Sequence, residues 1–358
     1  MQATHSFMKI YLIDPKKKWC KANLHCHTCH SDGFFTPEQM KKVYMEHGYQ
    51  IIAYSDHEMI FDNSHLTDEN FVALTATEYS IYDNNTPAND TYVDKNAKEI
   101  SWRDINTIHL CMISKDPHNT FHFATSEKNI TPYMIDKYQT YAHTTMKYDG
   151  YTREFTPESI QETIDRANKA GFLVQFNHPN WSLNTRDVYI NLKGLWGFEI
   201  LNYATELETG SDYCPNLYDD LLRFGHKEVC TMNDDNHNYE GSLEGSFGGF
   251  NYIGVDKLNY ENVIDAMEKG NIYCSSGPVI KSLYLDTDDG KFYIETSEAQ
   301  SIIMVGYNRT FRHYYGENIT KGDFKIFGEE VYFRFIVRDK YGRTAHTHAY
   351  FLKDYGYK

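Results

Sequence analysis

Hydrophobic residues in the first two thirds of this chain fall into seven short runs, separated by longer polar or helical stretches. The first run leads into His25, and the other six occupy residues 51–54, 71–77, 105–108, 172–176, 195–198 and 229–232. Near-continuous apolar runs that alternate with helical segments are typical of parallel strands buried on both faces. The pattern therefore predicts an α/β fold built on seven strands.

Two helices between these runs have clear start and stop signals. A Thr-Pro-Glu triplet at residues 36–38 and another at 156–158 each place a capping threonine before a proline suited to the first helical turn. Gly48 and Gly171 end the two helical patterns. We expect a helix between each triplet and the glycine that follows it.

Each apolar run ends near polar side chains, most of them able to bind a metal ion: His25, His27, Asp32, His57, Glu78, His109, His178, Glu199, Asn202, Asp235 and His237. In a closed α/β barrel the carboxyl ends of all strands meet at one face, where the active site lies. A doubly wound open sheet would gather its site at a single switch point instead. The spread of these side chains over all seven runs favours a closed α/β barrel of seven strands.

After residue 278 the hydrophobic pattern has no helical period and breaks into short β-rich segments, at residues 279–285, 291–295, 301–305 and 331–337. The turn residues between these segments indicate a small antiparallel sandwich. We therefore predict two domains, an α/β barrel over residues 1–278 and an all-β sandwich over residues 279–358.

Two stretches interrupt the barrel pattern. Residues 83–104 are polar and rich in asparagine, and residues 114–155 carry scattered aromatic and polar side chains. Loops of this length in a compact domain are usually functional. The second stretch is either a lid above the barrel mouth or a structural elaboration, and the sequence leaves both open. Its histidines are interpreted as surface or packing residues: His118, His122 and His143.

Composition excludes several classes of function. A formal charge of −15 opposes binding to nucleic acid polymers and anionic membranes. No apolar run has the length of a membrane-spanning helix, and residues 1–14 lack the features of a signal peptide. Seven cysteines without regular spacing indicate reduced thiols, and Cys26 and Cys29 are expected to pack rather than to bind metal. We therefore expect a cytoplasmic protein.

The metal-competent side chains at the run ends are imidazoles and carboxylates. In an extended strand His25 and His27 point to one face while Cys26 points to the other. Two imidazoles with a nearby carboxylate can bind a divalent cation. Mixed nitrogen and oxygen ligands suit manganese, iron or zinc, and the sequence does not choose among them.

The order of these motifs resembles that of the PHP (polymerase and histidinol phosphatase) family. Leu-His-Cys-His-Thr at residues 24–28, with Ser-Asp-Gly at 31–33, is similar to the first family motif, and Ser-Asp-His at 55–57 is similar to the second. The family fold is a distorted seven-stranded α/β barrel, and the likeness extends from His25 to His237. Residues 270–278, followed by a β domain, are similar to two-domain PHP-type metallohydrolases.

The resemblance implies a cluster of two or three divalent metal ions, Mn, Fe or Zn. Nine side chains would hold them: the first ion by His25, His27, Glu78 and Asp235, the second by Asp32, His57 and Glu78, and the third by His109, His178 and His237. Glu78, Asp235 and His237 are the expected catalytic residues.

Further side chains would assist these ligands. Asp56, beside a ligand histidine, would orient a ligand imidazole. Asn177, Asn202 and Arg186 are the expected substrate-binding residues. Arg153, from the 114–155 insertion, is the other cationic candidate for contact with a phosphate.

Closely spaced divalent cations suit phosphoester hydrolysis, because they lower the pKa of a bridging water and neutralise charge on the phosphate. We therefore expect a metal-dependent phosphoesterase that acts on a small phosphorylated molecule through a metal-bridging hydroxide. A carbamate, amide or ester hydrolase using the same site is one alternative. A non-catalytic, metal-stabilised binding module is another. Oligomerisation through the C-terminal β domain is left open.

Overall fold

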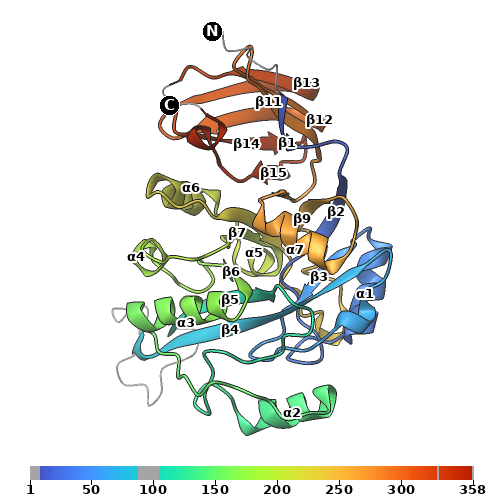
Figure 1. Ribbon diagram of the computed structural model, residues 1–358, viewed down its shortest axis with the longest axis vertical. Helices are drawn as coiled ribbons and strands as arrows, with labels where there is room; N and C mark the ends of the chain where they lie inside the picture. The colour runs from blue at the N-terminus through green and yellow to red at the C-terminus, as the bar shows by residue number, and fades with distance from the viewer. Residues whose placement is uncertain (1–8, 88–104, 329, 357–358) are drawn as a thin grey trace, which may run out of the picture.

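The computed structural model describes residues 9–87, 105–328 and 330–356. It shows a mixed α/β protein with a single sheet of 16 strands. The C-terminal strands lie at one end of the long axis and helix α2 lies at the other (Figure 1). Among the described residues no helix is both long and apolar enough to span a membrane.

The seven predicted apolar runs all coincide with strands, which neighbour one another in sequence order. They are β2 (Lys18–Asn23), β3 (Ile51–Tyr54), β4 (Val72–Pro87), β5 (Ile105–Ser114), β6 (Phe172–Phe176), β7 (Gly197–Asn202) and β8 (Val229–Asn233). β2, β3 and β4 are parallel, as are β6, β7 and β8. β5, however, is antiparallel to both of its neighbours. The expectation of an all-parallel sheet was therefore wrong at β5.

The series of paired strands ends at β8, but β8 lies close to β9 (Phe250–Val255), which precedes β2 in the same series. Strand β9 is antiparallel to β2, and the Asn251 amide donates 2.9 Å to the carbonyl of Met232 on β8. Cys26 and Asn236 form an isolated parallel bridge. Side-chain amides thus connect β8 to β9, and the closed seven-stranded barrel stays a prediction.

Seven α-helices are present among the described residues: α1 (Pro37–Glu46), α2 (Pro132–Ala142), α3 (Pro157–Lys169), α4 (Arg186–Tyr189), α5 (Tyr203–Thr209), α6 (Pro215–Arg223) and α7 (Tyr260–Glu268). Both predicted helix starts are confirmed. Thr36 and Gln39 form a capping box on α1, and the Thr156 side chain accepts the backbone N–H of Ser159 on α3. Short 3₁₀ turns lie at Ser64–Leu66, Tyr239–Gly241 and Leu352–Tyr355.

The C-terminal part is built from antiparallel strands: β10 (Ile272–Ser275), β11 (Ile280–Asp286), β12 (Lys291–Gly306), β13 (Phe311–Lys325), β14 (Tyr332–Arg338), β15 (Thr344–Thr347) and β16 (Tyr350–Phe351). β10 pairs with both β9 and β15, so the sheet continues from the α/β part into these strands. β1 (Lys9–Ile13), from the other end of the chain, pairs with β11. The division into two domains at residue 278 stays a prediction.

A buried ion pair joins the C-terminal strands to the helical part. The Arg334 side chain on β14 is 1% exposed and donates two bonds of 2.8 Å to Asp219 on α6. The same guanidinium lies 3.1 Å from Nδ1 of His346, whose Nε2 is 2.9 Å from the hydroxyl of Tyr213. Removing one member of such a network would leave a buried charge without its partner.

The insertion at 114–155 packs against the loop that follows the first histidine pair. The Lys137 ammonium on α2 donates to the carbonyl of Ser31, and the Tyr141 ring lies 4.5 Å from that of His30. His122 is fully buried, while His118 is exposed, as expected of packing and surface residues. Contact with this loop fits either a lid or a structural element. The other predicted loop, 83–104, lies mostly at residues 88–104, outside the described part of the chain.

His122 should make the stability of the insertion depend on pH. Its Nε2 accepts the backbone N–H of Ile60 at 3.0 Å, which requires the neutral ring, and burial lowers the pKa of His122 to about 4. Because that pKa lies below the unfolded value, the stabilisation is present above about pH 6.5 and is lost as the pH falls toward 4. The full loss of unfolding free energy is on the order of 3 kcal/mol.

Urea unfolding of wild type and His122→Gln between pH 4 and 8 tests this. The difference in unfolding free energy between the two proteins should shrink as the pH falls. His65→Gln, at a side chain 61% exposed, is the matched control and should leave the pH profile unchanged. A constant difference across the pH range would contradict the assignment.

Candidate metal centre

The Glu78 carboxylate lies at the centre of the predicted site. It is 1% exposed and lies in the middle of β4 rather than at a strand end. Five imidazoles surround it: Oε1 lies 3.1 Å from His25 Nε2, 3.2 Å from His109 Nδ1 and 3.2 Å from His178 Nε2, and Oε2 lies 3.3 Å from His27 Nε2 and 3.1 Å from His57 Nδ1. One carboxylate is therefore shared by five side chains from four segments.

The reversed direction of β5 explains how His109 reaches this centre. The residue lies in the middle of β5 and pairs with Ser80 on β4, two positions from Glu78. β4 and β5 continue past the site as an antiparallel pair. The expectation that every ligand sits where a strand ends was therefore wrong for Glu78 and His109, although both reach the predicted place.

Asp235 closes the buried side of the cluster. Its Oδ1 lies 3.1 Å from His25 Nε2 and 2.9 Å from His27 Nε2, and its backbone N–H donates to the His25 carbonyl at 3.0 Å. The residue has φ of +53°, in the left-handed region that few non-glycine residues adopt. This backbone conformation places the carboxylate directly after β8.

Asp32 and His237 form the open side of the cluster. Asp32 Oδ2 lies 3.4 Å from His237 Nε2 and 3.8 Å from His57 Nε2. The Asp32 side chain is 49% exposed, whereas His25 and His27 are fully buried. The His237 ring stacks on that of His27 with centroids 4.2 Å apart. Solvent and any substrate therefore meet Asp32 and His237 first.

Ligand atoms within 4.8 Å of one another form three groups: His25, His27, Glu78 and Asp235; His27, Asp32, His57 and His237; and His57, Glu78 and His109. The first group has the membership expected from the sequence. His237 groups with Asp32 and His57, rather than with His109 and His178 as expected. His178 adjoins the cluster through Glu78. The structure thus brings all nine predicted ligands together, in groups that differ from the expected ones.

The donor set fits divalent metal ions. Nε2 of His25 and Nε2 of His27 are only 3.3 Å apart, and Nε2 of His109 is buried without a hydrogen-bond partner among the described residues. Burial and the neighbouring His27 lower the pKa of His57 to about 3, which favours the neutral ring that binds metal. Nitrogen and oxygen donors without thiolate suit Mn, Fe or Zn.

The charge on Glu78 is also favourable for metal binding. Burial alone would raise the pKa of this carboxyl, but the neighbouring His25 and His109 hold it well below its ordinary value. The group is therefore an ionised carboxylate with almost no exposed surface. A buried anion of this kind requires positive charge close by.

Asp56 has a different role from the one expected. Instead of orienting an imidazole, its carboxylate accepts the backbone N–H groups of Thr28 at 2.8 Å and Ser31 at 3.0 Å. It thereby fixes the loop between His27 and Asp32. Gly33 completes the turn, because a Cβ at this position would lie 2.6 Å from the His27 carbonyl oxygen. The first motif is thus a rigid loop held by one buried carboxylate.

The two asparagines predicted to bind substrate both contact ligand carboxylates. Asn177 donates 2.7 Å to Glu78 Oε1, and Asn202 donates 3.1 Å to Asp235 Oδ2. Both are fully buried. Asn202 also caps helix α5, its side-chain oxygen accepting the N–H of Thr205. These contacts position the carboxylates.

Neither predicted arginine reaches the cluster. The exposed Arg186 stacks on Phe224, with its guanidinium carbon 4.5 Å from the ring centroid. Arg153 is buried, pairs with Glu58 and lies 4.2 Å from the centre of the Tyr79 ring. The expectation that Arg186 binds substrate finds no support in this arrangement, because an aromatic ring holds the guanidinium elsewhere.

Sequence reasoning missed Glu199 as a member of the site. This fully buried carboxylate lies 3.3 Å from His25 Nδ1, on the opposite side of the ring from Glu78, and accepts the His178 backbone N–H at 3.0 Å. A carboxylate in this position fixes the tautomer that leaves His25 Nε2 free for a metal. The signal was present, since Glu199 ends an apolar run as the predicted ligands do.

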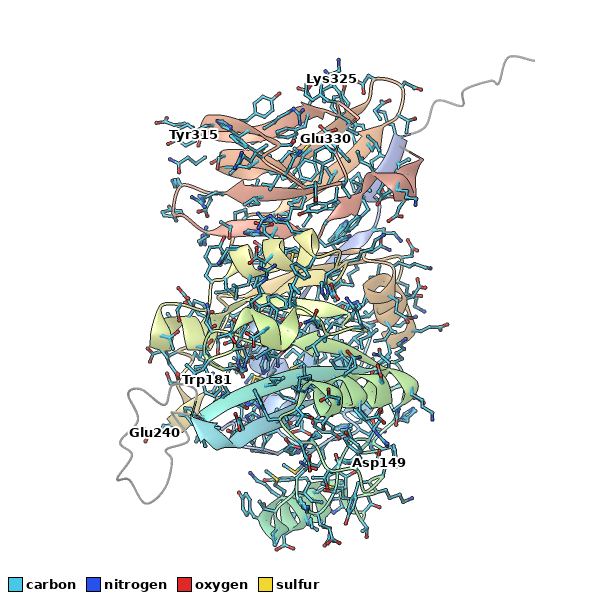
Figure 2. The ribbon with its side chains drawn as sticks, turned by 90° about the vertical axis from the view of Figure 1, so that its left-hand side faces the viewer. Asp149, Trp181, Glu240, Tyr315, Lys325 and Glu330 are labelled. Atoms are coloured by element: carbon cyan, nitrogen blue, oxygen red, sulfur yellow. The ribbon has the colours of Figure 1, made fainter. Side chains whose placement is uncertain are left out.

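Two aromatic side chains lie against histidines of the cluster. The Trp181 ring centroid lies 5.1 Å from that of His178 and 5.5 Å from that of His109, and Tyr239 stacks on His237 at 5.4 Å. Figure 2 shows Trp181 and Glu240, the neighbour of Tyr239, on the same side of the molecule. These rings could not be predicted from the hydrophobic pattern, because they come from separate loops.

No family model and no curated protein matches the chain. Among solved structures the chain is similar to a two-domain protein from Bacteroides vulgatus that contains a predicted PHP-like metal-dependent phosphoesterase. The two have 11% sequence identity and a TM-score of 0.42, and the match covers 98% of this chain and 100% of that chain. A candidate metal-dependent phosphoesterase from Bifidobacterium adolescentis has 18% identity and TM-score 0.34, with 60% and 87% covered. An amidohydrolase from Chromobacterium violaceum with bound sulfate and no metal has 13% identity and TM-score 0.36, with 70% and 96% covered. These likenesses are too distant to assign an activity.

Asp235→Asn tests the centre directly. Chelated wild-type protein should take up Mn²⁺, Fe²⁺ or Zn²⁺ and melt at a higher temperature, because a ligand that binds the folded state stabilises it. The variant should lose most of the bound metal and of the temperature shift. Elemental analysis and melting curves measure both. Asp256→Asn, at a carboxylate paired with Lys17 on the surface, is the control, and equal metal content in the two variants would refute the site.

Proposed function

We propose that this protein is a metal-dependent hydrolase, and specifically a phosphoesterase that acts on a small phosphorylated molecule. The observation that carries the proposal is the position of Glu78, a single buried carboxylate that belongs to two of the three groups of metal-competent side chains. A shared carboxylate holds cations close together, which is the arrangement used for displacement at phosphorus.

The ligands would divide as the geometry groups them. His25, His27 and Asp235 would share one divalent ion with Glu78. Asp32, His57 and His237 would hold a second. A third would lie beside Glu78 and His109, with His178 adjoining through Glu78. The proposal covers two or three ions of Mn, Fe or Zn. When bound, such ions lower the pKa of water and neutralise charge on a phosphate.

The protein's own side chains would perform distinct tasks in this reaction. Glu78 and Asp235 would fix the spacing of the cations, each braced by an asparagine amide at 2.7 and 3.1 Å. His237, whose side chain is 18% exposed and whose Nε2 lies 3.4 Å from Asp32, would hold a cation on the side of the cluster that meets the substrate. We therefore propose Glu78, Asp235 and His237 as the catalytic residues.

The surroundings of the cluster support a substrate with an apolar or aromatic portion. Trp181 and Tyr239 flank the open side, while Arg153 and Arg186 are both held elsewhere. A phosphate would then be bound by the metal ions, and the rest of the substrate by ring surfaces. The lack of contact from these arginines also favours the second candidate, a hydrolase of an uncharged carbamate, amide or ester.

The proposal also includes an architecture and a class of substrate. The strands from β2 to β8 would form the distorted barrel, closed by the side-chain amides at β9. The chain would divide near residue 278 into this barrel and a C-terminal β domain. The substrate would be a small molecule rather than a nucleic acid polymer, in agreement with the charge of −15.

Activity of metal-loaded protein separates the candidate functions. Wild type reconstituted with Mn²⁺, Fe²⁺ or Zn²⁺ should hydrolyse p-nitrophenyl phosphate or bis-p-nitrophenyl phosphate, and His25→Ala should lose at least about a thousandfold in kcat/KM, or about 4 kcal/mol. Turnover of aryl carbamates or esters alone would select the second candidate. No turnover of any substrate at full metal occupancy would contradict both and leave a binding module.

Trp181→Ala tests the contribution of the aromatic rim. Loss of one ring contact worth about 1 kcal/mol should raise KM for an aryl phosphate by about three- to tenfold, with kcat changed less. Glycerol phosphate, which has no ring, should be hydrolysed as by wild type. Metal content should stay unchanged, and an equal loss with both substrates would contradict a role in substrate binding.

A further inference from the structure

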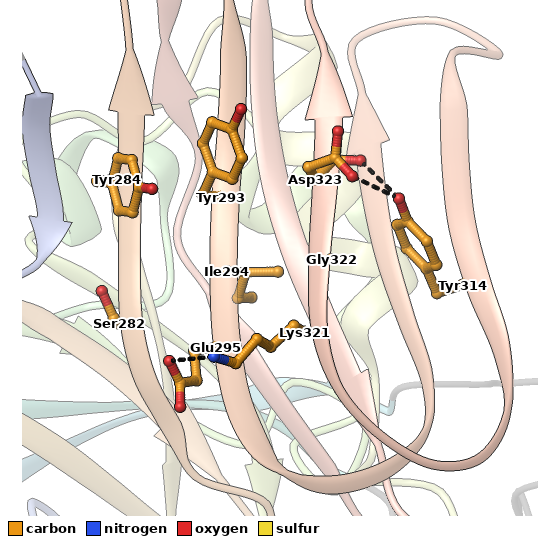
Figure 3. A pocket seen from close by; sticks show the side chains of 9 residues that line it. All are labelled: Ser282, Tyr284, Tyr293, Ile294, Glu295, Tyr314, Lys321, Gly322 and Asp323. Carbon is orange, nitrogen blue, oxygen red and sulfur yellow. Dashed lines mark hydrogen bonds and ion pairs between the residues drawn. The ribbon is translucent and has the colours of Figure 1, made fainter.

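The outer face of the C-terminal strands carries a row of tyrosines that the metal centre does not use. Tyr11 on β1 lies opposite Tyr284 on β11, which lies opposite Tyr293 on β12. Asp323 on β13 continues the row on the next strand. Figure 3 shows Tyr284 and Tyr293 side by side on neighbouring strands, with Asp323 beyond them.

The rings follow one another at about the spacing of the strands. The centroids of Tyr11 and Tyr284 are 5.4 Å apart, and those of Tyr284 and Tyr293 are 5.1 Å apart with planes only 15° from parallel. Tyr11 is 43% exposed. Three amphipathic rings therefore form a continuous aromatic strip that crosses three strands.

A second row of polar side chains runs beside the tyrosines. This row lies at the next outward-facing position of each strand. Its members pair across β11, β12 and β13, and they are Ser282, Glu295 and Lys321. Together the rows line a hollow of about 320 Å³ (Figure 3), at the lower end of the range of small-molecule sites. Tyr314 borders the hollow, its ring packed against Gly322, where a Cβ would lie 2.9 Å from the ring.

The charges in the hollow are paired with one another. Lys321 lies 3.5 Å from Glu295, and Lys291 lies 2.8 Å from Asp323. Asp323 also accepts the Tyr314 hydroxyl at 2.8 Å. A site for a phosphate or nucleic acid would present uncompensated positive charge. Both of these lysines lie beside a carboxylate, and the Lys9 ammonium lies over the Tyr284 ring, 4.7 Å from its centroid. The paired charges suit an uncharged ligand that offers many hydroxyl groups.

Packing of the strands does not require tyrosines at these positions. The core side of β11, β12 and β13 is filled by buried residues such as Leu283, Phe292 and Phe324. The outward positions alternate with them, and any polar residue would keep such positions soluble. The aromatic strip therefore requires an explanation other than the stability of the core.

We propose that this outer face binds an uncharged oligosaccharide. Sugar rings would pack their apolar C–H faces on Tyr284 and Tyr293, since a flat amphipathic ring offers contact area with little loss of entropy. Glu295, Lys321 and Asp323 would exchange hydrogen bonds with the sugar hydroxyls. The site is separate from the metal centre, and its occupancy does not depend on the proposed hydrolase activity.

Affinity electrophoresis of the full chain in gels containing soluble xylan, mannan, laminarin or hydroxyethylcellulose tests the proposal. Wild type should be retarded by at least one of these polysaccharides. Tyr284→Ala and Tyr293→Ala should each weaken the retardation by about tenfold. Tyr341→Ala, at an exposed tyrosine outside this face, is the matched control and should migrate as wild type does.

Tyr293→Phe keeps the ring and removes the hydroxyl, and should retain most of the binding. Melting curves of each variant identify any that does not fold. Failure of every polysaccharide to retard the wild type would overturn the proposal, as would equal retardation of wild type and the two alanine variants. Self-association abolished by Tyr284→Ala in sedimentation experiments would also overturn it, by assigning the face to a second copy of the chain.

Discussion

The contact of one buried carboxylate with five imidazoles is the constraint on which the rest of the site depends. Glu78 lies within 3.3 Å of nitrogens on His25, His27, His57, His109 and His178. These side chains come from distant parts of the sequence, so their convergence requires every intervening strand to keep its register. Burial of so many polar groups in one place is costly unless each has a partner. Positive ions at the shared oxygens would supply the missing partners, which is why the arrangement is read as a metal centre.

The residues around the ligands make this arrangement rigid. Asn177 and Asn202 each hold a ligand carboxylate, Glu199 lies behind His25, and Asp56 fixes the loop that carries His27. None of these side chains lies on the open side, where Asp32 and His237 are found. The site therefore has a stiff buried half, which sets the spacing of any cations, and an exposed half that is available to a substrate.

The positions of most ligands could be predicted because the chain places them directly after apolar runs. His25, His57, His178 and Asp235 follow this rule, and the structure brings them together as expected. Glu78 and His109 lie inside longer strands, because β5 runs against its neighbours, and a hydrophobic pattern does not report strand direction. Arg186, Trp181 and Tyr239 lie on loops or short helices, whose course depends on tertiary contacts with no sequence period. For this reason the convergence of the candidate metal ligands could be predicted from the sequence, whereas the side chains on the open side of the cluster could not.

The unbroken ladder from β9 through β10 to β15 bears on how such a chain could be recombined in evolution or in the laboratory. β10 hydrogen-bonds to a strand of the α/β part on one side and to a C-terminal strand on the other. A cut near residue 278 would leave β10 with an unpaired edge, and unpaired edges promote aggregation. It would also remove Arg334 from Asp219. The C-terminal strands are therefore not an exchangeable module. Any transplant of the metal centre must include another strand that pairs with the free edge of β10.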